Sequence, residues 1–91
     1  MEFSEYSHML GHHIQQIRRS RNLTQEQVAE LIVMDRVSIG YIEQGRRAPK
    51  LSTLFSLAQV YDVDMQEFFS VPYREQDSDL ADERQAEAQD E

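Results

Sequence analysis

Residues 23–45, LTQEQVAELIVMDRVSIGYIEQG, divide into two short amphipathic segments, each with a capping residue at its start. Thr24 and Gln27 match a capping box, the reciprocal side-chain pattern of a helix start, and predict a helix over residues 25–32. Asp35 is a favourable N-cap for a second helix, because its charge suits the positive helix end. Two short helices separated by about three residues predict a helix-turn-helix.

The segment between these helices, Leu31–Met34, is apolar and partly β-branched, so on its own it could also form a strand. It lies between two capped helical segments and has no pairing partner. We therefore assign it to the end of the first helix and a tight turn. The second helix is predicted to run to about Gln44, where Gly45 can end it in the left-handed conformation.

Apolar residues at helical spacing predict three more helices around this pair. They cover about residues 7–21, 51–61 and 65–69. Asn22 tolerates a left-handed backbone after the first of them, and Asp64 with Glu67 forms another capping box before the last. The sequence therefore predicts an all-α domain of five helices over residues 1–72.

The 91-residue chain has a formal net charge of −8, but its charges are unevenly placed. Residues 18–50 carry seven basic and four acidic side chains, whereas residues 73–91 carry two basic and eight acidic ones. Affinity for a polyanion depends on the local patch, so an acidic total does not exclude DNA binding. Residues 73–91 have few large apolar side chains and are predicted to form a disordered acidic tail.

These features occur together in one known family. The segment LTQEQVAE, followed by Ile39, Ile42, Glu43 and Gly45, closely resembles the Cro/C1-repressor (Xre-type) family, and the resemblance covers about residues 10–70. Within that family, MDRVSIGYIEQG is most similar to the small controller proteins of restriction–modification systems. The resemblance implies a lambda-repressor-like fold and a regulator that binds double-stranded DNA in a sequence-specific manner.

The outer face of the second helix is the candidate surface for base contacts, because Ile39 and Ile42 are expected to face inward. It carries Arg36, Val37, Gly40, Tyr41 and Gln44. Arg36 can present a bidentate fork to guanine, or instead clamp a phosphate or remain solvated. Gly40 costs about 1 kcal/mol against alanine inside a helix, which a close approach to DNA or to the preceding helix would justify.

A second group of residues is expected to contact DNA phosphates. It comprises Gln25, Ser38, Arg46, Arg47 and Lys50. By the resemblance, Gln25 would bind a phosphate with the free N–H groups of its helix start, or else would only begin that helix. Ser38 would touch the DNA backbone or cap its own helix. Arg46 and Arg47 are the candidates for sequence-independent electrostatic affinity.

The turn and its surroundings carry structural residues. The resemblance implies that Arg18 pairs with Glu43 beneath the second helix, since a glutamate facing DNA would be repelled. Ala29 would be the small residue at which the two helices cross. Val33 departs from the family, which often has glycine in this turn. Because a β-branched residue is poorly suited to a left-handed backbone, the turn must be right-handed, strained or shifted by one residue.

A single helix-turn-helix contacts only a few base pairs, so a specific operator usually needs two, in a near-palindromic arrangement. Apolar residues late in the domain exceed what a small core needs and suggest a symmetric homodimer. They are Tyr61, Val63, Met65, Phe68, Phe69 and Val71. Alternatively, Phe68 or Phe69 closes the base of the monomer itself.

Other chemistries find little support in the sequence. His8, His12 and His13 lie close together, but without further ligands on the same face we expect no metal and no cofactor. There is no nucleophile–base pair, phosphate-binding glycine loop or paired-carboxylate pattern, so we expect no enzyme. The chain has no cysteine, no long apolar run and no signal-peptide pattern, which suggests a cytoplasmic protein without a membrane partner.

The sequence therefore predicts a dimeric transcriptional regulator that occupies an operator and either blocks or contacts RNA polymerase. Two alternatives stay open. The chain could be the DNA-binding antitoxin of a toxin–antitoxin pair, with a toxin protein as partner, or a protein-interaction module that has lost DNA binding. The operator sequence and the sign of regulation are not defined by these residues.

Overall fold

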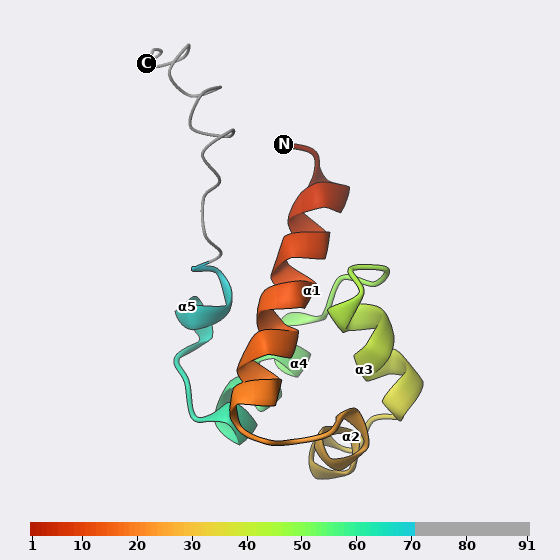
Figure 1. The fold of residues 1–91 in the computed structure, drawn as a ribbon, viewed down its shortest axis with the longest axis vertical. Coiled ribbons are helices and arrows are strands. Elements are labelled where there is room, and N and C mark those ends of the chain that lie inside the picture. The colour runs from red at the N-terminus through yellow and green to blue at the C-terminus, as the bar shows by residue number, and fades with distance from the viewer. Residues whose placement is uncertain (71–91) are drawn as a thin grey trace.

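The computed structural model describes residues 1–70, which form an all-helical domain without a strand, as predicted. The five helices are α1 (Phe3–Ser20), α2 (Gln25–Ile32), α3 (Arg36–Glu43), α4 (Leu51–Tyr61) and α5 (Met65–Phe68). Helix α1 lies between α3 and α5, and α2 lies at its C-terminal end (Figure 1). The predicted tail and Val71 lie outside the described residues. None of the helices within residues 1–70 is long and apolar enough to cross a membrane.

The helix boundaries follow local capping chemistry, with two departures from prediction. Helices α2 and α4 have the predicted bounds. Helix α1 begins four residues earlier than predicted, because the Glu2 N–H donates to the Glu5 carboxylate at 3.3 Å and so starts the helix at Phe3. The predicted capping box of α5 is not formed. Since α5 is a single turn, the backbone oxygen of Asp64 accepts from the Glu67 N–H at 2.9 Å instead.

All five helices contribute to one core. Its buried members are Leu10, Ile14, Val28, Ala29, Ile39, Ile42, Leu54, Leu57, Ala58, Tyr61 and Phe68. The rings of Tyr61 and Phe68 meet edge to face, with centroids 6.4 Å apart and an interplanar angle of 81°. Both side chains are fully buried inside the monomer, so Phe68 closes the base of the monomer, the alternative left open by the sequence, and neither ring is exposed for a dimer contact. These two rings are among the largest side chains that fill the small core.

The close crossing of α1 and α3 depends on Gly11, which is buried. A Cβ atom at this position would meet the backbone oxygen of Ile42 and would lie 2.7 Å from that of Glu43. Only a residue without a side chain allows the two helix backbones to approach so closely. The position of α3 on the domain is therefore fixed by a glycine that the sequence prediction did not single out.

The turn between α2 and α3 is strained. Val33 ends α2 with φ 59° and ψ 52°, the left-handed conformation that a β-branched residue adopts at a cost. This geometry lets the N–H of Met34 donate to the backbone oxygen of Ala29 at 2.9 Å, which closes the helix end. Of the three possibilities that the sequence left open for this turn, strain is therefore the one observed. Asn22 and Gly45 adopt the left-handed conformation as predicted.

Replacing Val33 with glycine is expected to raise the free energy of unfolding by roughly 1 kcal/mol. Glycine removes the left-handed strain of about 1–2 kcal/mol, part of which its larger unfolded-state entropy cancels. The valine side chain is 89% exposed, so little packing is lost. Urea titration measures the change, with Val37→Gly as the matched control. Val37 is exposed within α3, so its replacement is expected to destabilise the protein by about 1 kcal/mol. Equal losses in the two variants would show that Val33 is not strained.

Candidate nucleic-acid interface

Helix α3 presents one face to the core and one to solvent. Ile39 and Ile42 are buried, as predicted, while Arg36 and Val37 are exposed in the first turn. The Asp35 carboxylate accepts from the Ser38 N–H at 2.7 Å and caps the helix. This backbone hydrogen bond holds the pKa of Asp35 below its ordinary value. The cap keeps the first turn of α3 in shape without using its exposed side chains.

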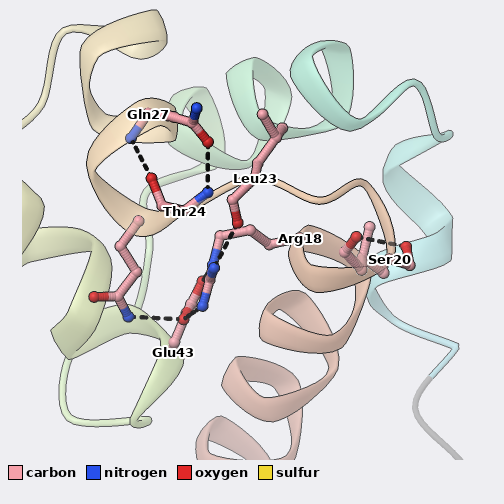
Figure 2. A network of polar contacts seen from close by, with 8 residues as sticks. Arg18, Ser20, Leu23, Thr24, Gln27 and Glu43 are labelled. Atoms are coloured by element: carbon pink, nitrogen blue, oxygen red, sulfur yellow. Dashed lines mark hydrogen bonds and ion pairs between the residues drawn. The ribbon is translucent and has the colours of Figure 1, made fainter.

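Beneath α3 lies a buried ion pair that joins three segments of the chain. Arg18 donates through Nε to Glu43 Oε2 at 2.7 Å and through Nη2 to Oε1 at 3.1 Å. Its third donor group, Nη1, binds the backbone oxygen of Leu23 at 2.7 Å. Figure 2 shows Arg18 between Glu43 and Leu23, so that one guanidinium connects α1, α3 and the loop before α2. The hydrogen bonds to Glu43 raise the pKa of Arg18. The predicted Arg18–Glu43 pair is thus present and structural.

The same carboxylate holds Gln25 at the start of α2. The Gln25 side chain donates through Nε2 to Glu43 Oε1 at 2.9 Å. An ionised carboxylate only accepts hydrogen bonds, so this contact fixes which end of the amide faces Glu43. A side-chain amide has two N–H groups, and the second one is left for another acceptor. Gln25 is therefore more than a helix-start residue, since Glu43 sets the direction of its side chain.

An arginine cluster lies at the C-terminal end of α3. The guanidinium groups of Arg46 and Arg47 lie over the Tyr41 ring, with their central carbons 4.8 and 5.2 Å from the ring centroid. Arg47 also donates to the Ser38 hydroxyl at 2.9 Å, and Arg46 contacts the Gln44 side-chain oxygen at 3.5 Å. Tyr41 therefore orients both cations through the weak attraction between a guanidinium and an aromatic face, and Ser38 orients Arg47 by accepting its hydrogen bond. The sequence prediction had placed Ser38, Arg46 and Arg47 with the phosphate contacts and Tyr41 with the base contacts.

The basic side chains near α3 are not neutralised by their neighbours. Within residues 1–70, the ion pair of Arg18 with Glu43 is the one contact of 4 Å or less between a basic and an acidic side chain. Arg36, Arg46, Arg47 and Lys50 are all exposed. Because phosphate contacts need cations whose charge is not already compensated, this patch suits a polyanion.

Gly40 has room for a methyl group. A Cβ atom there would lie 3.7 Å from Gln25 Oε1, which is ordinary van der Waals contact. Close packing against α2 therefore does not explain this glycine, which was one of the two explanations considered from the sequence. Its position on α3, between the buried Ile39 and the half-buried Tyr41, leaves the approach of an external partner as the remaining explanation.

The histidines of α1 serve separate contacts. His13 Nε2 lies 2.9 Å from the backbone oxygen of Glu67 and so connects α1 with α5. His12 Nε2 contacts the Gln16 amide at 3.4 Å, one turn along the same helix. Within residues 1–70, no three histidine or acidic side chains lie close enough together to hold a metal ion. The contact of His13 across helices was not predicted from the sequence.

Two capped helices, a left-handed turn and a basic exposed face define a helix-turn-helix domain of the Cro/C1 (Xre) type. The helix-turn-helix family model, HTH_3, matches residues 14–68, so the chain belongs to this family. Its resemblance to Cro/C1-type regulators, predicted from residues 23–45, is thereby confirmed.

Curated relatives are transcriptional regulators. The chain is 39% identical over 62 residues to the HTH-type transcriptional regulator PuuR of Escherichia coli, a match that covers 68% of this chain and 34% of PuuR. It is 34% identical over 70 residues to the HTH-type transcriptional activator BcrR of Enterococcus faecalis, covering 77% of this chain and 31% of BcrR. The chain thus spans about a third of the length of these relatives. Against the control protein C.SmaI of Serratia marcescens it is 33% identical over 63 residues, covering 69% of this chain and 75% of C.SmaI.

Solved structures show the same fold. The restriction–modification controller protein C.AhdI from Aeromonas hydrophila superposes with a TM-score of 0.72 at 28% identity, covering 76% of this chain and 100% of that chain. A transcriptional regulator of the HTH_3 family from Vibrio cholerae superposes with a TM-score of 0.68 at 23% identity, covering 76% of this chain and 39% of that chain, and supports the fold alone. The chain therefore has the fold of the HTH_3 family to which it belongs.

Proposed function

We propose that this protein is a sequence-specific transcriptional regulator that binds a near-palindromic operator as a homodimer, with α3 in the major groove. The observation that carries the proposal is the exposed face of α3 together with Arg46 and Arg47, which follow this helix, lie over Tyr41 and pair with no carboxylate within residues 1–70. Such a face combines groups that can contact base edges with cations that can contact phosphates. Occupation of an operator near a promoter would block or recruit RNA polymerase.

The side chains of α3 divide into two groups in this proposal. Arg36, Val37 and Gln44 contact base edges, and Gly40 allows the helix to approach the groove closely. Phosphates are bound by Gln25, through its second amide N–H, and by Arg46, Arg47 and Lys50. Tyr41 and Ser38 act mainly by holding the two arginines, since both already contact them. This refines the roles expected from the sequence, where Tyr41 was placed with the base contacts.

We infer a homodimer because one α3 contacts only a few base pairs, whereas two copies contact two half-sites of the operator. With Tyr61 and Phe68 inside the core, the surface for self-association consists of Phe69, which is 45% exposed, and the half-buried Val63 and Met65. A symmetric dimer through these residues would place two α3 helices for successive half-sites of one operator.

Fluorescence anisotropy on duplexes from upstream of the protein's own gene, compared with scrambled duplexes over a range of salt, tests this function. Arg36→Ala is expected to lose about 5–150-fold in preference for the upstream DNA, equivalent to one bidentate base contact. Arg46→Ala/Arg47→Ala is expected to weaken binding to all DNA sequences. It is also expected to reduce the slope of log K against log salt concentration by about 2 per chain. Arg19→Ala is the matched control, because Arg19 is exposed in the last turn of α1 and lies outside the helix-turn-helix. Absence of duplex binding at low salt would refute the proposal.

A further inference from the structure

An apolar groove of about 270 Å³ opens between the first turns of α1, the loop before α4 and the end of α5. Its walls include Phe3, Tyr6, Leu10, Pro49, Leu51 and Phe69. Phe3 and Leu51 are each 71% exposed. The groove, which we call the N-terminal groove, is smaller than the roughly 300–1,000 Å³ of small-molecule sites and suits one or two side chains of a peptide. Its apolar lining suits an apolar side chain of an occupant.

Residues next in sequence to the lining of the N-terminal groove carry charge, basic before α4 and acidic at the start of α1. Lys50 lies between two of its lining residues, Pro49 and Leu51, and Arg47 directly precedes the lining residue Ala48. Near the lining residue Phe3, Glu2 is the N-cap of α1 and Glu5 lies in its first turn. An occupant is therefore expected to be a peptide with an apolar side chain for the groove and acidic residues directed toward the loop before α4.

The chain itself carries such a peptide. Residues 73–91 contain eight acidic and two basic side chains, and they begin with Tyr73, a large residue with an aromatic ring. Tyr73 lies four residues beyond Phe69, which itself lines the groove, so a reach of at most about 13 Å is available. We propose that the acidic C-terminal segment of the same chain binds here, with the Tyr73 ring in the N-terminal groove and Glu75, Asp77 and Asp79 against Arg47 and Lys50.

At the N-terminal groove, tethering favours this occupant over a second copy of the chain, so that Val63 and Met65 remain for the proposed dimer contact when the segment covers Phe69. A segment joined by a few residues has an effective local concentration of the order of millimolar, which a separate molecule must exceed to displace it. Arg47 and Lys50 also belong to the phosphate-binding group, so the bound segment competes with DNA for two cations. This regulatory consequence rests on the proposed function, whereas the docking of the segment does not.

Docking is tested on the full chain by isotope-filtered NMR in the absence of DNA. The Tyr73 ring is expected to give nuclear Overhauser contacts to the Leu51 methyl groups, and the contacts are expected to disappear in Tyr73→Ser. A mixture of labelled and unlabelled chains separates contacts within one chain from contacts between two. Absence of contacts, or contacts only between chains, would overturn the proposal, the latter in favour of an exchanged dimer. Because no DNA is present, failure of the proposed function cannot produce either result.

Competition is tested with the same anisotropy assay on scrambled duplex at low salt. Tyr73→Ser is expected to bind about 3-fold more tightly than the unmodified protein, and Leu51→Ser, which alters the groove side, is expected to do the same. Two control variants leave the net charge of the chain unchanged and remove an apolar side chain outside the proposed contact. They are Leu80→Ser, later in the segment, and Leu31→Ser, which is 60% exposed on α2. If Tyr73→Ser and Leu80→Ser gave equal affinities, the segment would act only as diffuse charge, and the competition would be refuted.

Discussion

Replacing Glu43 with alanine is expected to lower the free energy of unfolding by about 3–5 kcal/mol, the range seen when one partner of a buried ion pair is removed. The side chains of Glu43 and Arg18 are 1% and 9% exposed, so the remaining guanidinium cannot regain its hydration without opening the domain. The Gln25 amide loses its acceptor at the same time. A loss of this size is a large fraction of the roughly 5–15 kcal/mol that stabilises a typical domain. Urea-induced unfolding monitored by circular dichroism measures it.

Two further variants separate the unpaired charge from a general effect of substitution. Glu30→Ala removes an exposed glutamate from α2 and is expected to change stability by no more than about 0.5 kcal/mol. Arg18→Met/Glu43→Leu removes both charges and is expected to recover most of the loss, because the cost lies mainly in the unpaired cation. If the double variant were no more stable than Glu43→Ala, the lost hydrogen bonds to Leu23 and Gln25 would be the dominant cost instead.

The parts of the fold that the sequence predicted correctly are those governed by local chemistry. The capping box of Thr24 with Gln27 and the N-cap Asp35 act within one helical turn, so α2 and the start of α3 were predicted from neighbouring residues alone. The error at α5 shows the limit of this reasoning. Asp64 and Glu67 match the same pattern, yet a single-turn helix is closed by backbone hydrogen bonds and leaves the side chains unused.

The parts that could not be predicted depend on three-dimensional proximity. Sequence periodicity indicated that Tyr61 and Phe68 are apolar residues on helix faces, but only packing decides whether such residues fill the core or cover the surface. The cluster of Tyr41 with Arg46 and Arg47 has a sequence signal, an aromatic residue five and six positions before two arginines, but that signal has meaning only once the chain turns at Gly45. The strain at Val33 was recognised as a conflict, and the structure resolved how the backbone accommodates it.

Replacing Gly11 with alanine is expected to lower the free energy of unfolding by about 2–3 kcal/mol, although alanine is the better helix former. The added methyl group would meet the backbone oxygen of Ile42 and lie 2.7 Å from that of Glu43. Neither atom can rotate away as a flexible side chain would, so α3 must move as a unit. That movement also displaces Glu43 from Arg18. The weakened ion pair therefore adds to the cost of the steric clash. Thermal and urea-induced unfolding measure the loss.

Gly40→Ala is the control that gives the opposite result, since it makes the same substitution in a helix that has room for it. The nearest atom, Gln25 Oε1, lies 3.7 Å from the new methyl position, so the variant is expected to be about 1 kcal/mol more stable than the unmodified protein. Its DNA affinity is nevertheless expected to fall about 10-fold, because the proposed approach of α3 to the major groove needs this space. A rise in stability with unchanged affinity would place Gly40 away from the DNA. A fall in stability would show instead that the crossing of α2 and α3 excludes the methyl group. The two substitutions thus separate two roles of glycine. At Gly11 it lets α1 approach α3 of the same domain, and at Gly40 it is proposed to let α3 approach DNA.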